Sequence, residues 1–563
     1  MACGAATALM LSAAMSWPAL GAAAAAAPLP PAPPVDAFVT RNGWQLELGG
    51  QAFRFAGMNV FWLGLEADHQ PGTPDCGWPG APCYYYPSTF RIQDVLATAA
   101  ALGANVVRSQ TLGVSSQSPV VAQFNPTTCV KSDVAFGRHR LSLFPSQRVS
   151  STDELRFNDA AFAPIETAIA AAKALGIRLI VPLTDNYCYF HGGYTDFVWA
   201  FTGKVCNPFP KRMPVLGDPC RAFFDPTSDE TGNATIVGFR EYVRHVLEHK
   251  LPGGNLLKDE PTILAWELGN ELQLSGPVAA AWVESTAAFI KDGLGARQLV
   301  MDGRDGAQFV HDSVNWTAPE FLHLPSVDIS TDHFYTGWEP TAAAIVRTDG
   351  QTYQEAARAY VVGEYAPRTY TLAQAQDMAS TLQGQGAVAG DLWWSLQGHG
   401  DAYGYVPHHD GYTMTYTMSD PARQAVLDLQ RRHAFAMRGL PVPEDTPPPS
   451  APELTSVDGC TVAWRGATLA VTYDVRARNG SGAAWEQLCS GCANDTAASM
   501  PWHDDYSAAC ADGEGGGAGY AYSVRGRSRG GAPGSWSAPL GPGGVDRRSG
   551  APALRGAPAP RSP

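Results

Sequence analysis

The sequence predicts an α/β protein: a (β/α)8 barrel, or TIM barrel, with an N-terminal β-hairpin and a small C-terminal β-sandwich domain. Three observations predict this fold class. Eight apolar, β-prone runs alternate with stretches of helical period, which indicates strand–helix units around a parallel sheet. Two Pro-rich stretches bracket these runs within residues 38–439. Alternating apolar and polar residues then follow the second stretch, as they do in β-sandwich strands.

The eight runs are spaced so that a helix can follow each strand. Residues 92–102 repeat apolar side chains at helical spacing, and FNDAAFAPIETAIAAAKALG predicts a helix from a capping Asn158 to Gly176. We favour a closed barrel over an open doubly wound sheet, because no nucleotide-binding glycine motif follows any run. The runs are AFRFAGMNVFW (52–62), ANVVRSQ (104–110), IRLIVPLTDN (177–186), TILAWELGNE (262–271), QLVMDG (298–303), VDISTDHFY (327–335), AYVVGEY (359–365) and VAGDLWWSL (388–396).

Composition shifts divide the chain into six predicted segments. An apolar stretch that ends in small residues resembles a secretory signal, although it lacks Lys and Arg; a disordered Ala-rich leader is the alternative. TRNGWQLELGGQAF, with NG and GG turns, predicts a hairpin that covers the barrel floor. The segments are a signal peptide (1–27), a Pro-rich leader (28–37), the barrel domain (38–439), a Pro-rich linker (440–453), the β-sandwich (454–542) and a disordered tail (543–563).

The sandwich segment resembles a fibronectin type III module at Trp464, Tyr473 and the run 522–536. It contains Cys489-x-x-Cys492, which could begin a four-Cys zinc site but which we interpret as disulfide-forming in an exported chain.

Charge and cysteine content restrict the class of partner. A formal net charge of −14 disfavours nucleic acid and anionic membranes, and no apolar run after the leader approaches the ~20 residues of a membrane span. Ten cysteines follow Cys3, an even number that suits disulfides in a secreted protein, with Cys76–Cys83 and Cys206–Cys220 as the local pairings. We expect a secreted monomer. Its N-x-[S/T] glycosylation sequons lie at Asn233, Asn315, Asn479 and Asn494.

Polar residues end most of the predicted strands, at the barrel mouth where active sites lie in this fold. Glu271 ends the fourth run and Glu364 the seventh, 93 positions apart, close to the ~94 expected for three strand–helix units. Paired carboxylates across one cleft suggest glycoside hydrolysis, and a retaining pair lies about 5–5.5 Å apart. The other polar or aromatic strand ends are Arg108, Asp185, Asn186, Asn270, His333, Tyr335, Trp393 and Trp394.

These residues resemble a known family. WELGNE, HFY, GEY and the strand-eight tryptophan resemble glycoside hydrolase family five over residues 38–439, and FAGMNVFWL, KDEPTILAWELGNEL and VDISTDHFY look like its endo-β-1,4-mannanase branch. The resemblance implies Glu271 as general acid/base, Glu364 as nucleophile, Asn270 at the sugar 2-hydroxyl or the nucleophile, and no metal or organic cofactor. It also implies a β-1,4-mannan-type polysaccharide substrate. The usual Asn-Glu-Pro is Asn270-Glu271-Leu272 here, which leaves the substrate more open than the reaction.

The remaining roles follow from the resemblance or from position. The resemblance implies Arg108 and Tyr335 beside the nucleophile, His333 near the acid/base and Trp394 as the sugar platform. Arg108 and Tyr335 should lower the pKa of Glu364, and the charge of Glu364 should raise the pKa of Glu271. By position at strand ends or in following loops, Trp62 and Trp338 are expected to stack on sugars, whereas Trp393 is expected in the core. Asn186, with Asp185, either lines the cleft or caps the next segment.

Two further features have structural interpretations. Glu267 lies four residues before Glu271, about 13 Å along a strand, so we predict a buried structural acid well below the mouth, bonded to Arg108 or a neighbouring polar group. PHHDGY (407–412) has adjacent histidines but no third ligand at helical spacing, which favours a substrate-facing loop over a metal site.

Alternative functions remain open from the sequence alone. Within the same chemistry they are an exo-β-mannosidase or a β-1,4-glucanase, because strand-end residues do not report the sugar's C2 configuration. A non-catalytic carbohydrate-binding wall protein is the alternative of another class, although such a protein need not keep both Glu271 and Glu364. A metal-dependent barrel hydrolase would need more His and Asp ligands at strand ends than His333.

Overall fold

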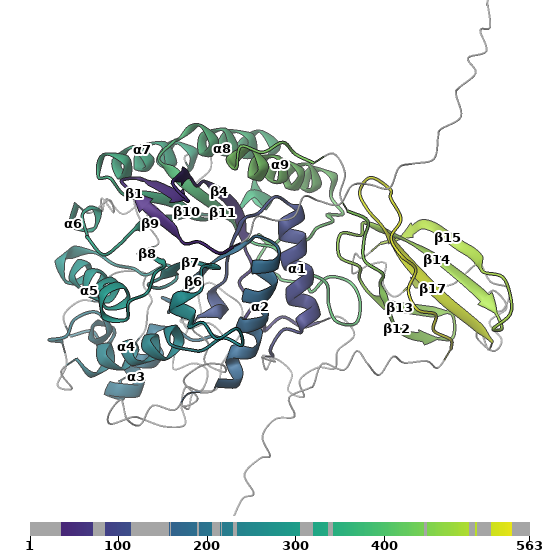
Figure 1. The fold of residues 1–563 in the computed structure, drawn as a ribbon, viewed down its shortest axis with the longest axis horizontal. Helices are drawn as coiled ribbons and strands as arrows, with labels where there is room; N and C mark the ends of the chain where they lie inside the picture. The colour runs from purple at the N-terminus through teal and green to yellow at the C-terminus, as the bar shows by residue number, and fades with distance from the viewer. Residues whose placement is uncertain are drawn as a thin grey trace, which may run out of the picture.

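Eight strands close into a parallel barrel in the order β10-β11-β4-β5-β6-β7-β8-β9 (Figure 1). This computed structural model describes residues 35–70, 85–113, 157, 159–187, 191–204, 206, 214, 217–228, 233–304, 319–335, 342–443, 447–494, 502–503 and 519–542. Each of the eight apolar runs supplies one strand, so the predicted fold class is confirmed. The strands are β4 (Phe55–Asn59), β5 (Val106–Arg108), β6 (Arg178–Pro182), β7 (Ile263–Glu267), β8 (Leu299–Met301), β9 (Ile329–Phe334), β10 (Ala359–Tyr365) and β11 (Val388–Trp393).

The strands are apolar along their whole length because both of their faces are buried. In β7, Leu264 and Ala265 belong to the cluster inside the barrel, whereas Ile263 and Trp266 belong to the cluster shared with the helices. Val39 and Leu46 join the inner cluster, so the antiparallel sheet at the N-terminus covers the barrel floor as predicted. That sheet is formed by β1 (Val39–Asn42), β2 (Gln45–Leu48) and β3 (Gln51–Ala52).

Helices surround the barrel (Figure 1). A 3-10 turn, Asp159–Ala161, leads directly into the helix that begins at Phe162; Asn158, the predicted cap, lies outside the described residues. Gly176, at φ +70°, follows the end of that helix as predicted. The described α-helices are α1 (Thr89–Ala101), α2 (Phe162–Ala174), α3 (Tyr194–Thr202), α4 (Ala234–Leu247), α5 (Gly276–Ala288), α6 (Pro319–Leu322), α7 (Ala342–Glu355), α8 (Leu372–Gly384) and α9 (Pro421–Met437).

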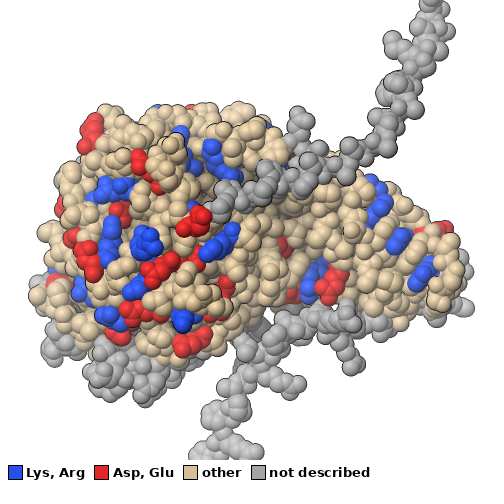
Figure 2. Space-filling view, viewed as in Figure 1, with Lys and Arg blue, Asp and Glu red and all other residues tan. Residues whose placement is uncertain are grey.

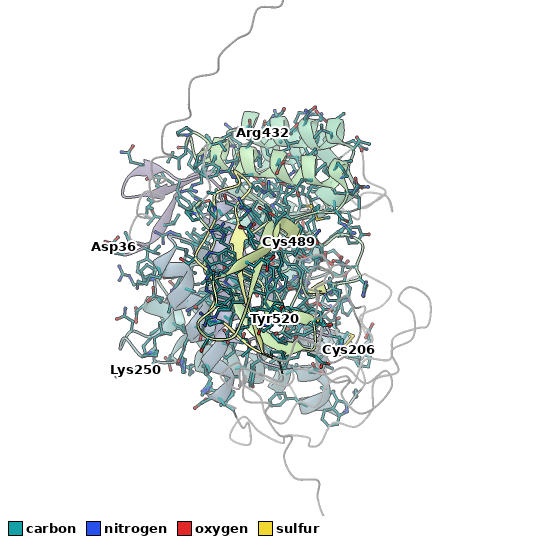
Figure 3. The ribbon with its side chains drawn as sticks, turned by 90° about the vertical axis from the view of Figure 1, so that its right-hand side faces the viewer. Asp36, Cys206, Lys250, Arg432, Cys489 and Tyr520 are labelled. Atoms are coloured by element: carbon teal, nitrogen blue, oxygen red, sulfur yellow. A yellow bond between two sulfur atoms is a disulfide. The ribbon has the colours of Figure 1, made fainter. Side chains whose placement is uncertain are left out.

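Two three-stranded antiparallel sheets form a β-sandwich after the barrel (Figures 1 and 3). Trp464 and Tyr473, from different sheets, meet in its core with ring centroids 5.2 Å apart. Figure 3 looks onto this unit, with Cys489 and Tyr520 in front of the barrel. One sheet contains β12 (Glu453–Asp458), β13 (Thr461–Arg465) and β16 (Trp502–His503); the other contains β15 (Glu486–Ala493), β14 (Thr472–Asn479) and β17 (Tyr520–Arg527).

Two disulfides lie within the described residues. Cys206–Cys220 was predicted and is confirmed, whereas Cys76 and Cys83 lie outside the described part of the chain. Cys489–Cys492 is also a disulfide, which removes the zinc-site alternative for that motif.

The surface of the barrel carries charges of both signs. Figure 2 shows Lys and Arg interspersed with Asp and Glu over the face in view. Among the described helices, none has the length and apolar character that crossing a bilayer would require.

Candidate active site

Arg108, the last residue of β5, is the centre of a buried hydrogen-bond network at the carboxyl ends of the strands. A guanidinium has five N–H donors, and here each has an acceptor. Nε and Nη2 donate to the two oxygens of Glu267 at 2.6 and 2.8 Å, and Nη2 also donates to Asn270 Oδ1 at 2.7 Å. Nη1 donates to Asn59 Oδ1 at 2.9 Å and to Glu364 Oε1 at 2.7 Å. One fully buried side chain therefore fixes four polar groups.

Glu364 projects from β10 into this network. Its Oε2 accepts a short hydrogen bond from the Tyr335 hydroxyl, and Gln110 Nε2 lies 3.4 Å from its Oε1. The preceding residue must be glycine, because a Cβ on Gly363 would lie 2.7 Å from His333 Nε2. Register between β9 and β10 shifts at this point, which brings Glu364 opposite His333.

Glu271 approaches the same point from the segment after β7. The regular strand ends at Glu267, and Glu271 holds a left-handed φ of +51°, a conformation that costs a non-glycine residue about 1–3 kcal/mol. His333 Nδ1 lies 2.9 Å from Glu271 Oε1 and 3.5 Å from Glu364 Oε2. One atom from each of the three side chains lies within 4.8 Å of the others. The strained turn therefore aims Glu271 at Glu364 across His333.

Asn270, directly before Glu271, and Asp185, in the segment after β6, support the network. Asn270 Nδ2 donates to Asp185 Oδ2 at 3.0 Å, and His191 Nε2 lies 2.9 Å from the same oxygen. Asp185 also accepts from the backbone N–H of Tyr187, so it both caps the following turn and holds Asn270. Asn186 is buried beside this segment and accepts a 3.4 Å contact from the backbone N–H of Gln273, outside the Arg108 network.

Trp394 is the half-buried aromatic residue that follows β11 at the mouth. Its Nε1 donates to Asp410 Oδ2 at 2.7 Å, and its ring stacks on Phe61 at 5.6 Å between centroids. His408 also contacts the Phe61 ring and pairs with Asp68 at 2.8 Å. The PHHDGY motif therefore packs around Trp394 and Phe61 through Asp410 and His408.

Burial and the neighbouring charges set the protonation of the site. Burial raises the pKa of Glu364; His333, Arg108 and the Tyr335 hydroxyl oppose that effect without reversing it. The expected net lowering of the Glu364 pKa is therefore wrong, because loss of water, together with the charge of Glu271, outweighs these three groups. For His333, burial lowers the pKa, but Glu364 and Glu271 outweigh it and raise the pKa to about 9. His333 is thus a cation at neutral pH between two carboxyl groups.

Two expected positions need correction. Trp62 is fully buried, with Arg91 stacked 4.2 Å from its ring and Nε1 directed at Leu396 O, so it packs in the core and offers no face to a sugar. Glu267 is bonded to Arg108 as predicted, but it shares that guanidinium with Glu364 and so lies in the mouth network, above the depth predicted for it. Trp393 is buried as expected, and Trp338 lies outside the described residues.

Sequence reasoning missed Asn59, Gln110 and Asp410. Gln110 ends the second run as a polar residue, as Arg108 nearly does, whereas Asn59 lies inside the first run and ends β4 only in the structure. Asp410 lies in a loop, and nothing in the sequence placed it beside Trp394.

One group of three potential metal ligands occurs in the described part of the chain: Glu271, His333 and Glu364. It coincides with the carboxylate pair, and His333 Nδ1 already lies in hydrogen-bonding contact with Glu271. Two glutamates and a histidine at these distances can exchange protons with one another and with a bound substrate.

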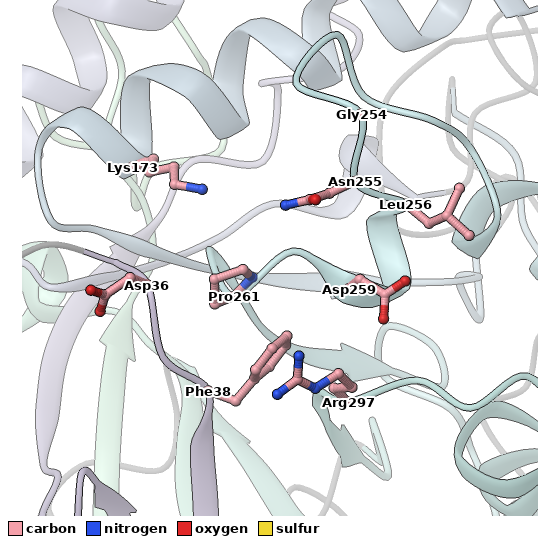
Figure 4. Close-up of a pocket in the computed structure, with 9 residues that line it drawn as sticks. All are labelled: Asp36, Phe38, Lys173, Gly254, Asn255, Leu256, Asp259, Pro261 and Arg297. Carbon is pink, nitrogen blue, oxygen red and sulfur yellow. The ribbon is translucent and has the colours of Figure 1, made fainter.

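A separate cavity of about 540 Å³ lies at the opposite end of the barrel (Figure 4). Pro261 and Arg297, which precede β7 and β8, line it together with Phe38 before β1. It is therefore at the amino ends of the strands, away from the carboxylate pair.

Comparisons with known proteins concern the family that the chain resembles. Residues 145–366 match the family model described as GH family 5 beta-mannosidase-like, a region that includes Glu271, His333, Tyr335 and Glu364. A putative mannan endo-1,4-beta-mannosidase P from Arabidopsis thaliana is 24% identical over 416 residues, covering 66% of this chain and 85% of that protein.

Two further matches extend over similar lengths. Mannan endo-1,4-beta-mannosidase 5 from Solanum lycopersicum is 25% identical, covering 72% of this chain and 90% of that protein. The structure of an endo-1,4-beta-mannanase from Rhizomucor miehei is 21% identical, with a TM-score of 0.49, covering 71% of this chain and 99% of that one. The family-model match and the curated relatives set aside a non-catalytic wall protein, and we conclude that the chain is a glycoside hydrolase similar to the mannosidases of family 5.

Proposed function

We propose that this protein is an exported, monomeric retaining glycoside hydrolase that cleaves β-1,4-linked mannan-type polysaccharide. The approach of Glu271 and Glu364, with one oxygen of each within 4.8 Å, is the observation that carries the proposal. Retaining enzymes hold their carboxyl groups about 5–5.5 Å apart, whereas inverting enzymes need about 6.5–9.5 Å to admit a water. The short separation supports double displacement.

In the first step, Glu364 attacks the anomeric carbon and the glycosidic bond breaks. Glu271 gives its proton to the departing oxygen, and a glycosyl ester forms on Glu364. Arg108 and Tyr335 each hold one oxygen of Glu364, which fixes the attacking carboxylate before the sugar arrives. In the second step, Glu271 takes a proton from water, which attacks the same carbon and frees the sugar with its original configuration.

The electrostatics support both roles of Glu271. Burial raises the pKa of Glu364, while His333 and Arg108 favour its charged form, so the nucleophile depends on these two cations to ionise. Once the ester forms, the negative charge on Glu364 disappears. Glu271 then faces one anion fewer and gives up its proton more readily, as a general base requires.

The family model and the names of the curated relatives favour mannan as the substrate. Trp394, half-buried directly after β11, supplies an aromatic ring on which a pyranose can stack. An exo-β-mannosidase or a β-1,4-glucanase would use the same carboxylates, so product size and sugar identity decide among them.

Two experiments test the reaction. Reducing-sugar release should be measured on mannan, glucomannan, cellulose, mixed-linkage glucan and xylan, with sizing of the products; mannan cleaved internally is the expected result, and release from cellulose alone would overturn the substrate. Glu364→Ala should lose turnover and regain it with azide, which yields a glycosyl azide of inverted configuration. Glu260→Ala, at a buried glutamate near the other end of β7, is the matched control and should need no azide.

Export and the monomeric state have separate tests. The leader at 1–27 and the Cys206–Cys220 and Cys489–Cys492 disulfides support export to an oxidising compartment. A mature N-terminus near residue 28 is expected by N-terminal sequencing, and retention of Met1 on the exported protein would contradict cleavage. Light scattering should give the mass of one chain.

A further inference from the structure

The loop after β11, residues 394–418, connects the active site to the β-sandwich. We call it the β11 loop. One part of it lies at the barrel mouth, where Asp410 holds Trp394 and the Tyr412 ring meets the Tyr335 ring at 5.0 Å. The opposite part, residues 399–405, contacts the sandwich. The same loop therefore contacts the barrel mouth with one part and the sandwich with the other.

The interior of the β11 loop is bonded as one unit. Gln397 N–H donates to Met414 O at 2.9 Å, and Met414 N–H donates to Ser395 O at 2.8 Å. The His399 and Tyr405 rings stack at 4.4 Å, which closes the end that faces the sandwich. Such cross-bonding makes the loop respond as a rigid piece.

The sandwich holds this end through residues 465–471, which we call the docking loop. Thr468 Oγ1 donates to Asp94 Oδ1 at 2.8 Å, and both oxygens of that carboxylate lie 3.0 Å from His399 Nδ1. Gly466 lies against the same histidine: a Cβ there would be 2.3 Å from His399 Cδ2. Asp94 on α1 is thus shared between the barrel loop and the sandwich.

Further contacts fix the docking loop to the barrel. Arg465 Nε donates to Asp401 O at 3.1 Å and stacks on Phe90 at 4.7 Å. Leu469 belongs to the main core cluster of the barrel and holds a left-handed φ of +67°. A leucine keeps that backbone only when its surroundings demand it. These contacts describe a fixed junction between the two units.

The sandwich also contacts the β11 loop at Tyr416 and at Ala402. Arg529 Nη2, just beyond β17, donates to Tyr416 O at 2.7 Å, and its guanidinium lies 4.7 Å from the Tyr416 ring. Thr455 Oγ1 donates to Ala402 O at 3.0 Å. The sandwich therefore contacts the loop before and after the segment that carries Asp410 and Tyr412.

We infer that the β-sandwich is a positioning element of the active site, which acts through His399 and the β11 loop to set the Trp394 platform. The inference rests on the proposed function for the role of Trp394. A domain held only by the Pro-rich linker would leave kinetic constants unchanged when its surface is altered. This sandwich instead forms part of the wall that supports the sugar site.

Gly466→Ala tests the inference, because the added methyl must displace His399. Gly482→Ala is the matched control: it lies in the same sandwich with open space around its Cβ. In Gly466→Ala we expect KM for mannan or manno-oligosaccharides to rise about five- to tenfold, with kcat within about twofold, because Trp394 binds the sugar and does not touch the reacting bond. Amide hydrogen exchange should quicken in residues 394–418. Gly482→Ala should match the wild type in both measurements.

Thr468→Val, which removes one hydrogen bond and keeps the shape, should give a smaller KM rise in the same direction and covers the case in which Gly466→Ala fails to fold. Rates are divided by the concentration of active sites, measured by titration, so that unfolded protein does not lower the calculated kcat. A wild-type KM in both folded variants, or faster exchange confined to the sandwich, overturns the inference. A wild type inactive on every β-glycan would instead refute the proposed function, and the exchange data would still report the coupling.

Discussion

Arg108 donates two parallel hydrogen bonds to Glu267, from Nε to Oε2 at 2.6 Å and from Nη2 to Oε1 at 2.8 Å. This bidentate pair uses one edge of the guanidinium and leaves Nη1 directed at Glu364. Burial of two unpaired carboxylates near each other would be costly, and one planar cation forms hydrogen bonds to both and fixes their geometry. Glu267 therefore acts on the proposed nucleophile indirectly, by setting the plane of Arg108.

The first prediction concerns Arg108→Lys. An ammonium has three donors on a flexible stem and cannot hold four partners, so the Glu364 carboxylate loses its fixed orientation. We expect kcat/KM to fall about 10²–10³-fold, which corresponds to about 3–4 kcal/mol, with a lower melting temperature. Arg178→Lys is the control, because Arg178 is also buried in a strand but bonds Pro261 O at the other end of the barrel. Equal losses of kcat/KM in both variants would contradict the prediction.

The second prediction concerns the proton on Glu271. If Glu271 is the general acid, kcat/KM falls as pH rises through its pKa, and Glu271→Gln should abolish this basic limb. The profile should be measured for both proteins on an aryl glycoside with a poor leaving group, whose departure depends on protonation. Glu284→Gln, at the half-buried Glu284 on α5, should keep the wild-type profile. An unchanged basic limb in Glu271→Gln would reject the assignment.

A third prediction follows from His333, whose pKa in the folded protein is raised to about 9. Because the folded state holds this proton more tightly than the unfolded state, the stabilisation is complete below about pH 6.5 and is lost as pH rises towards 9. In His333→Asn the group no longer titrates. The free energy of unfolding is measured with denaturant for both proteins. The amount by which the wild type exceeds the variant should fall by up to about 3 kcal/mol between pH 6 and pH 9.5. A difference that stays constant over this range would count against a charged His333.

The fourth prediction concerns a buried acid pair outside the site, Asp349 on α7 and Asp332 on β9. Burial, with the charge of Asp332, raises the pKa of Asp349 to about 9, despite the opposing effect of Arg304. The unfolded chain loses this proton near pH 4 and the folded chain only near 9, so folding stability falls as pH rises between them. Asp349→Asn should therefore exceed the wild type in free energy of unfolding by at least about 1 kcal/mol at pH 8 and by less at pH 4. Asp377→Asn, at an exposed site on α8, should show no such trend.

The barrel could be predicted because its strands are buried on both faces and are therefore continuously apolar. Each of the eight runs became a strand, and the polar residue that ended a run marked the mouth. Arg108, Glu364 and Tyr335 were found in this way, and the structure brings them into contact. Asn59 lies inside the first run, so the end of the run did not mark it, yet it also bonds Arg108.

The features that escaped prediction depend on the path of the backbone in three dimensions. Four residues of ideal strand separate Glu267 from Glu271 by about 13 Å, but β7 ends at Glu267 and the chain then turns through a left-handed Glu271. Trp62 follows β4 as the cleft-lining prediction required, yet Arg91 from α1 covers its ring. The pKa of Glu364 depends on how completely the barrel excludes water, which no spacing of residues reports.

The bonds of Arg108 reach across the barrel from β5 to β7 and to β10, near opposite ends of the barrel sequence. The bonds to Glu267 need only β5, β6 and β7, whereas the bond to Glu364 on β10 requires the later strands and the closed sheet in which β11 pairs with β4. A chain that has folded through β7 alone holds a guanidinium with one carboxylate and no nucleophile. Recovery of activity during refolding should thus coincide with closure of the barrel, which makes turnover a reporter for the last step of folding.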